Sequence, residues 1–227
     1  MITDEQEQKL RELVKIFLEE NKKINLSAMR DEESIWIGSV LDSLAFLDMI
    51  EKFSVFRFPF SVLDVGTGGG FPLLPLAICK PDCLFTGMDS TQKKLDSIRR
   101  MTDALKLSNV HLLTGRCEEK GRDEMHRDSY DIVTARAVAP LNVLLEYGAP
   151  FVKPGGHLVA WKSMKVETEL EESLLARAEL SCHLSKAYEY GLPGDWGKRQ
   201  LLIFEKTSET NQRYPRDVGI PKKSPLL

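Results

Sequence analysis

Short apolar segments alternate with longer helical segments from residue 61 onwards, and this alternation limits the chain to few folds. Helical periodicity marks residues 72–80, 90–107 and 140–152. Five apolar segments are predicted as buried parallel strands: SVLDV (61–65), LFTGMD (84–89), VHLLTG (110–115), YDIVTA (130–135) and HLVAW (157–161). Parallel strands joined by helices form a doubly wound sheet with right-handed crossovers. The sequence therefore predicts an α/β fold.

The first 60 residues are predicted to be helical. Thr3 and Gln6 form a capping box ahead of an amphipathic helix. Asp31 is predicted as the N-cap of a second helix. The apolar stripes of both helices are interpreted as core packing, so this part is predicted to be a helical extension of the sheet domain.

A long helix over 165–180 is predicted to lead to a last strand, QLLIFEK (200–206). The final segment carries three prolines and four basic residues and is predicted as an extended tail. The chain is thus predicted to have three parts: a helical extension (1–60), a core (61–206) and a basic, proline-containing tail (207–227).

The composition is that of a soluble globular protein, with 42% hydrophobic and 29% charged residues in 227. The polar N-terminus MITDEQEQKL resembles neither a signal nor a transit peptide, so a cytoplasmic protein is expected. A monomer is the default expectation. Four cysteines without a C-x-x-C pair and four scattered histidines predict no metal site. The net charge of −3 argues against a wholly nucleic-acid-binding surface but permits a local basic face.

The glycine-rich loop GTGGGFP (66–72) follows the first predicted strand. Ligands of parallel sheets bind beyond the carboxyl ends of strands, where glycines let the backbone approach them closely. A phosphate-binding P-loop would end in Gly-Lys-Ser/Thr, whereas this loop ends in Phe71-Pro72. Its third glycine also comes one residue earlier than in the dinucleotide fingerprint. Two cofactors are considered further: S-adenosyl-L-methionine (SAM) and a nicotinamide dinucleotide.

Residues after the second and third predicted strands bear on this choice. Asp89 can accept both ribose hydroxyls of either cofactor. Cys117 and Glu118 can lie beside an adenine ring, and the Pro-Gly-Gly turn before the fifth strand is common in class I methyltransferases. Together these features favour SAM. Structural interpretations remain: Asp64 as a cap of the loop, Glu118 as an acid favoured at a helix start, and Cys117 as a packed residue.

The segment TARAVAPL (134–141), after the fourth strand, supplies an arginine and no general base. It lacks the D-P-P-Y turn of amino-group methyltransferases, and neither it nor the following helix holds the cysteine that pyrimidine C5 methylation needs. Ribose 2′-O methylation stays open, with Lys162, Asp131 and Lys94 around an acceptor hydroxyl.

Five motifs together resemble the RsmG (GidB) family in order and spacing: LDVGTGGGFPLLPLAI, GMDSTQKKLDSI, GRCEE, DIVTARAVAPL and YPRDVGIPKKSPL. The resemblance runs from residue 25 almost to the C-terminus. It implies a class I SAM-dependent methyltransferase, a Rossmann-like doubly wound sheet with an N-terminal helical extension. It also implies methylation of N7 of a guanine, the 530-loop guanine, in 16S ribosomal RNA or the small ribosomal subunit.

N7 of guanine explains the missing base, because it carries a lone pair and no proton. Such an enzyme works by orientation and electrostatics. The resemblance implies cofactor contacts, and general methyltransferase patterns add Gly68 and Asp89 to give this set: Gly66, Gly68, Phe71, Asp89, Cys117, Glu118 and Arg136. Arg136 can contact either the cofactor or the O6/N7 edge of guanine.

Basic residues near strand ends and in the tail are candidates for binding RNA phosphates: Arg136, Lys162, Arg199, Arg213, Arg216 and Lys222. The chain departs from the family at Gly38-Ser39, where an Arg-His pair is common, and mildly at Ser163, where glycine is common. The first departure leaves a further alternative, a module that binds SAM without transferring its methyl group.

Overall fold

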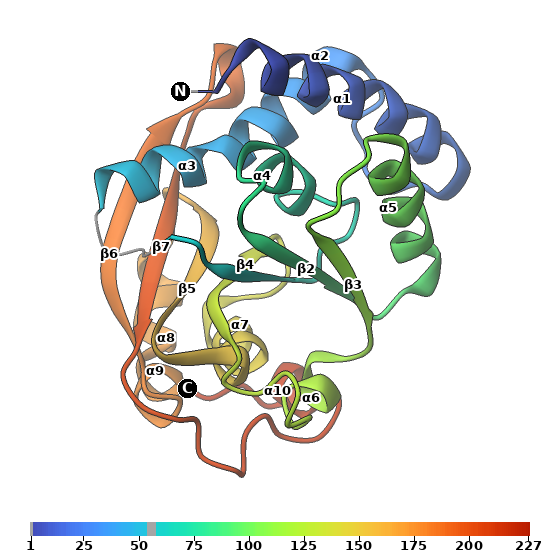
Figure 1. Ribbon diagram of the computed structural model, residues 1–227. Coiled ribbons are helices and arrows are strands. Elements are labelled where there is room, and N and C mark those ends of the chain that lie inside the picture. Colours follow the sequence, from blue (N-terminus) through green and yellow to red (C-terminus); the bar gives the residue numbers. More distant parts are fainter. Residues whose placement is uncertain (1, 54–57) are drawn as a thin grey trace.

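The structure, a computed structural model, describes residues 2–53 and 58–227 (Figure 1). Its described residues form one seven-stranded sheet in the order β3-β2-β1-β4-β5-β7-β6. The first five strands of this order are parallel, whereas β7 runs antiparallel to both neighbours. The strands are β1 (Ser61–Val65), β2 (Leu84–Asp89), β3 (Val110–Thr114), β4 (Tyr130–Arg136), β5 (Val152–Ser163), β6 (Cys182–Gly191) and β7 (Lys198–Lys206).

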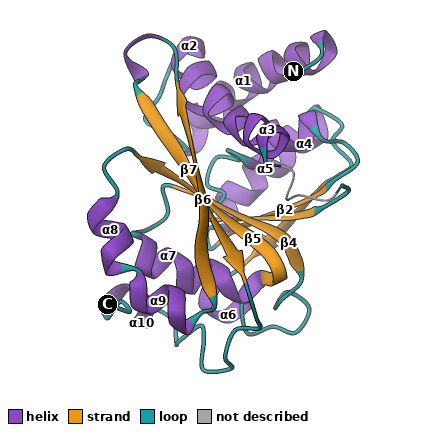
Figure 2. Cartoon of the chain, turned by 90° about the vertical axis from the view of Figure 1, so that its left-hand side faces the viewer, coloured by secondary structure: helices purple, strands orange, loops and turns teal. Residues whose placement is uncertain are grey.

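Helices cover both faces of the sheet (Figure 2). One face carries α1 (Asp4–Ile24), α2 (Glu32–Ile35), the π-helical η1 (Trp36–Leu41), α3 (Asp42–Lys52), α4 (Leu73–Cys79) and α5 (Gln92–Ala104). The other carries α6 (Cys117–Lys120), α7 (Leu141–Gly148), η2 (Ala149–Phe151), α8 (Glu167–Glu172), α9 (Leu174–Glu179) and α10 (Ile220–Lys223). The short η3 (Gly194–Trp196) lies between β6 and β7. Each face buries its own hydrophobic cluster, as a two-sided parallel sheet requires.

The sequence signals for strands and helix starts are confirmed in the first two thirds of the chain. All five predicted strands are present, and β1 and β2 have the predicted bounds. Thr3 and Gln6 form the capping box of α1, and the Asp31 side chain caps α2 by accepting from the Ser34 N–H. The two caps need no tertiary information because each one satisfies backbone groups of its own helix start.

In the last third, one strand was missed and two predictions are wrong. Strand β6 was not predicted, because it is an edge strand whose exposed positions include Lys186 and Glu189, so no apolar run marks it. The single helix over 165–180 is two short helices that meet at Ser173. The tail is not extended: it contains α10 and folds back against α6 and α7 (Figure 1).

Helix α1 packs against the glycine loop and supports its conformation. A Cβ on Gly69 would lie 2.8 Å from Cε2 of Phe17 in α1, so only glycine permits this close approach. The rings of Phe17 and Phe71 meet edge to face with centroids 5.0 Å apart. Gly68 has a φ of 56°, in the left-handed region that glycine tolerates. The conformation of the loop therefore depends on residues far from it in sequence.

Candidate cofactor site

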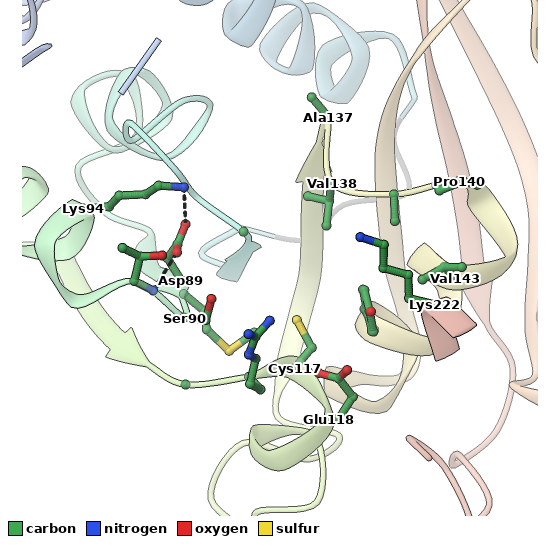
Figure 3. A pocket seen from close by; sticks show the side chains of 17 residues that line it. Asp89, Ser90, Lys94, Cys117, Glu118, Ala137, Val138, Pro140, Val143 and Lys222 are labelled. Atoms are coloured by element: carbon green, nitrogen blue, oxygen red, sulfur yellow. Dashed lines mark hydrogen bonds and ion pairs between the residues drawn. The ribbon is translucent and has the colours of Figure 1, made fainter. Parts of the chain in front are cut away.

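A cavity of about 380 Å³ lies at the carboxyl ends of the parallel strands (Figure 3). Its wall is formed by the segments that follow β1, β2, β3 and β4, including the start of α6, by helix α7, and by one residue of the tail. Its lining includes Gly66, Asp89, Thr91, Lys94, Arg116, Cys117, Glu118, Ala137, Val138, Ala139, Pro140, Val143, Tyr147 and Lys222. This is the position at which open parallel sheets bind their ligands.

Asp89 ends β2 with its carboxylate held in place from three sides. One oxygen accepts from the Thr91 N–H at 2.8 Å and the other from the Gly68 N–H at 3.1 Å. The Lys94 ammonium lies 3.7 Å from the same carboxylate (Figure 3). Asp89 thus connects the glycine loop to β2 and presents a fixed acceptor at the cavity, which suits a pair of ribose hydroxyls.

Cys117 and Glu118 begin α6 at the floor of the cavity (Figure 3). Burial raises the pKa of the Cys117 thiol to about 12, so the sulfur is a neutral wall atom and not a nucleophile. Glu118 is buried, and its carboxylate accepts from the Gly219 N–H of the tail at 2.9 Å. This contact joins the cavity to the C-terminal segment.

Asp64 lies in β1 immediately before the glycine loop. Its Oδ1 accepts from the Thr134 hydroxyl at 2.8 Å. Burial raises the pKa of this carboxyl to about 6, and the Thr67 hydroxyl of the loop opposes that rise as a hydrogen-bond donor to it. Both side chains are buried and neither lines the cavity. Asp64 and Thr67 therefore fix the start of the glycine loop from beneath the cavity wall.

Arg136 ends β4 and points toward the N-terminal helices. Its Nη1 donates to the Gly38 carbonyl at 3.1 Å and to Asp42 Oδ2 at 2.9 Å. Its guanidinium carbon lies 5.8 Å from the ring centroid of Phe71. Its Nε and Nη2 donate to no group among the described residues, so two of the three nitrogens remain available to a ligand.

Asp42 gathers three further contacts around this arginine. The carboxylate is fully buried and also accepts from the Tyr190 hydroxyl at 2.7 Å, and Arg199 lies 3.2 Å away. The indole N–H of Trp161 donates to the Asp42 carbonyl at 2.9 Å. This role of Asp42 was not predicted from the sequence, because Arg136, Tyr190 and Arg199 lie more than 90 positions away along the chain.

Comparisons with known proteins agree with this geometry. Residues 6–192 match the family model GidB, described as rRNA small subunit methyltransferase G. The chain belongs to the GidB family. Proteins named ribosomal RNA small subunit methyltransferase G share 40% identity over 230 residues in Staphylococcus carnosus and 38% over 226 in Lactobacillus helveticus. Both matches cover 100% of this chain and 93% of the relative.

Solved structures show that the fold of this GidB member is a class I methyltransferase fold. TYW2 from M. jannaschii in complex with AdoMet has a TM-score of 0.53 at 17% identity, covering 71% of this chain and 76% of that one. The ribosomal protein L11 methylase from Lactobacillus delbrueckii subsp. bulgaricus has a TM-score of 0.52 at 17% identity, covering 72% and 77%. Family and fold together make the chain a SAM-dependent methyltransferase and exclude the nicotinamide alternative.

The predicted cofactor residues of the GidB chain fall into two groups. Gly66, Asp89, Cys117 and Glu118 line the cavity directly. The other three do not line it. The Gly68 N–H donates to Asp89 and the Phe71 ring packs against Phe17. Arg136 donates to Asp42. Val143 and Tyr147, which line the cavity from one side of α7, were not predicted as site residues.

The predicted RNA-binding residues are dispersed, and most form ion pairs within the chain. The Lys162 ammonium donates to the Glu169 carboxylate at 2.6 Å, and the Arg216 guanidinium donates to the carboxylate of the fully buried Glu146 at 2.7 Å. Arg199 pairs with Asp42, and Arg213 pairs with Glu179. Lys222 alone of the six has no ion-pair or hydrogen-bond partner within residues 2–53 and 58–227, and it reaches into the cavity (Figure 3).

Residues 2–53 and 58–227 contain no cluster of three His, Cys, Asp or Glu that could hold a metal ion. In the same part of the chain, no helix is long and apolar enough to cross a membrane.

Proposed function

We propose that this chain transfers a methyl group from SAM to N7 of a guanine in 16S ribosomal RNA. The names of its relatives support the RNA class. The observation that carries the choice of atom is the cavity wall after β4, which consists of Ala137, Val138, Ala139 and Pro140 and offers no ionisable group. A guanine N7 has no proton to lose, so a wall without a base is sufficient.

The cofactor, when bound, supplies a methyl group activated by its sulfonium. In the proposed site Asp89 accepts from the ribose hydroxyls, and Cys117 with Glu118 faces the adenine edge. Gly66 permits close backbone approach, with a φ of 67°. Asp64 and Thr67, which are buried beside each other, hold the start of the glycine loop. These groups bind and orient, and orientation is the main source of rate in a methyl transfer without proton removal.

Arg136 is proposed to contact the target guanine. The Gly38 carbonyl and Asp42 fix one end of its guanidinium, which leaves Nε and Nη2 for the O6/N7 edge or a phosphate. Its side chain is 19% exposed, so a ligand can reach it. The other candidates except Lys222 have ion-pair partners, and Arg199 and Arg213 are proposed as RNA contacts because their side chains are more exposed than those of Lys162 and Arg216.

Ribose 2′-O methylation receives less support from the geometry. Asp131 lies at the start of β4, where it binds the Ser61 N–H at 2.8 Å and Lys153 at 3.1 Å. Lys162 lies near the end of the adjacent β5 and is paired with Glu169. The acid and the lysine that this chemistry would use are therefore at opposite ends of the sheet.

The division into a helical extension (1–60), a methyltransferase core (61–206) and a tail (207–227) is proposed as the functional organisation. In this scheme the extension supports the glycine loop and holds Arg136, as the Phe17 and Asp42 contacts suggest. A cytoplasmic monomer acting on the small ribosomal subunit is proposed as the working form.

A methylation assay tests the proposal. The chain is incubated with radiolabelled SAM and unmodified small subunits or deproteinised 16S RNA, and the labelled nucleosides are identified. The expected product is 7-methylguanosine. Label in a 2′-O-methylated nucleoside would refute the choice of atom. SAM binding with no label in either RNA would indicate that the chain binds the cofactor without transferring its methyl group to this RNA.

A further inference from the structure

The C-terminal segment is tied to the cofactor cavity by several independent contacts. We call residues 210–223 the strap. The guanidinium of Arg127 donates to the Tyr214 carbonyl at 2.9 Å, and Arg122 donates to the Pro215 carbonyl at 2.9 Å. Tyr214 and Pro221 are buried. The strap is therefore a packed part of the fold, held against α6 and the loop that follows it.

The strongest of these anchors is a buried ion pair with α7. The backbone N–H of Arg216 donates to Glu146 Oε1 at 2.8 Å, and its guanidinium donates to both oxygens at 2.7 to 3.1 Å. Glu146 is fully buried. Since α7 also supplies Val143 and Tyr147 to the cavity, this anchor fixes the strap relative to the cavity wall.

The last part of the strap belongs to the cavity itself. The Gly219 N–H donates to Glu118, and Lys222 lines the cavity three residues later. In Figure 3 the Lys222 side chain reaches toward the centre of the cavity from the side of Pro140 and Val143, opposite Asp89. Its ammonium has no partner among the described residues, so it is available to whatever fills the cavity.

We propose that Lys222 contacts the adenosyl group of the bound cofactor, and that Glu118 couples the docking of the strap to cofactor binding. This inference rests on the proposed function, which places SAM in this cavity. Adenine carries ring nitrogens that accept hydrogen bonds, and an ammonium group is a donor without an acceptor site. Lys222 is thus a cofactor-contacting residue carried by the tail.

The location of Lys222 favours the cofactor over RNA as its ligand. Its ammonium shares the cavity with Asp89, Cys117 and Glu118, the groups that face ribose and adenine in the proposed site. Its neighbour Lys223 is also exposed but does not line the cavity. The two lysines therefore have different roles, although they are adjacent on α10.

Glu118 can couple strap docking to cofactor binding because it contacts both. Its carboxylate accepts from the Gly219 N–H of the strap and lies beside the proposed adenine site. A ligand that orders this carboxylate also favours the docked strap, and by reciprocity the docked strap raises affinity for the ligand. Bound cofactor should therefore slow amide hydrogen exchange in the strap.

The first experiment measures calorimetric affinities of the full chain for SAM and S-adenosylhomocysteine in Lys222→Ala and the matched control Lys223→Ala. Loss of one hydrogen bond from a charged donor predicts roughly tenfold weaker binding in Lys222→Ala. Both ligands share the adenosyl group, so both should weaken equally. We expect Lys223→Ala to stay within about twofold of wild type, and neither variant to change the thermal midpoint without ligand, since both side chains are exposed.

The outcomes separate the inference from the function on which it rests. Unchanged cofactor affinity in Lys222→Ala would overturn the contact, and weaker binding of small subunits in that variant would assign Lys222 to RNA instead. Hydrogen exchange of residues 214–223 that does not respond to S-adenosylhomocysteine would overturn the coupling. Failure of the wild-type chain to bind either ligand would contradict the proposed function and not merely the role of the strap.

Discussion

At the scale of single residues, the buried carboxyl of Asp64 gives the cofactor-free chain a specific pH dependence. Burial raises its pKa from about 3.8 to about 6, so the folded chain keeps a proton that the unfolded chain has released. The bound proton stabilises the folded chain fully below about pH 4, and this contribution to the free energy of unfolding is lost as pH rises through about 6. An asparagine side chain does not titrate, so Asp64→Asn does not lose this contribution. The free energy of unfolding of the variant, relative to that of wild type, should therefore rise by roughly 3 kcal/mol between about pH 4 and about pH 6.

Urea unfolding without cofactor at about pH 4.5, 5.5 and 7 measures this difference. Equal differences between Asp64→Asn and wild type at the three pH values would show that Asp64 titrates at an ordinary pKa. Calorimetry should also find weaker SAM binding in the variant at about pH 7, because the substitution changes the contact between residue 64 and Thr67 that fixes the start of the glycine loop.

Asp42 is the second residue whose effect can be predicted. Its fully buried carboxylate neutralises Arg136 and Arg199, so Asp42→Asn leaves two cations without their counter-charge. Removing one partner of a buried pair predicts a loss of roughly 3 kcal/mol in the free energy of unfolding. Methyl transfer should fall as well, since Arg136 loses its fixed orientation. Asp48→Asn on the exposed side of the same helix α3 is the control and should leave both quantities near wild type.

The assay for this variant compares kcat with KM for SAM. A fall in kcat with an unchanged KM for SAM would agree with a role of Arg136 at the guanine. A change confined to the KM for SAM would place Arg136 at the cofactor instead.

At the scale of elements, helix α1 should control cofactor affinity through the glycine loop. Phe17 packs against Phe71 and against the Cα of Gly69. Phe17→Ala opens a cavity behind the loop and should lower the free energy of unfolding by roughly 3–5 kcal/mol. SAM should also bind more weakly, measured by calorimetry below the unfolding transition. Leu18→Ala, a less buried neighbour in α1, should lose less stability and keep the affinity of wild type.

The elements also show how far sequence reasoning extends. Strands β1, β2 and β4 were predicted because burial on both faces leaves continuous apolar runs, such as VLDV and YDIVTA. The edge strand β6 carries no such run and was missed. Asp89, Cys117 and Glu118 were found because they follow strand ends. Asp42 with Arg136, and Glu118 with Gly219, could not be predicted as pairs, since each joins residues more than 90 positions apart.

At the scale of the whole molecule, both ends of the chain converge on the cavity formed by its middle. The N-terminal helices hold the glycine loop and Arg136, and the strap supplies Lys222 and binds Glu118. The cavity is therefore complete only when the extension and the tail are both packed on the sheet. Stability and cofactor affinity should respond together to changes at either end.

Two arginines of the tail test this dependence. The Arg216 guanidinium pairs with a fully buried carboxylate of α7, so Arg216→Ala leaves Glu146 without a counter-charge and with only the backbone N–H of residue 216 as a donor from the strap. The expected loss in the free energy of unfolding is about 3 kcal/mol, and SAM affinity should fall because the strap loosens. Arg213 lies three residues earlier and pairs with Glu179 at the surface, so Arg213→Ala should remain close to wild type in both respects. Denaturant unfolding measures the free energy of unfolding of both variants, and calorimetry measures their affinity for SAM. Wild-type SAM affinity in a folded but destabilised Arg216→Ala variant would show that the strap stabilises the fold without taking part in cofactor binding.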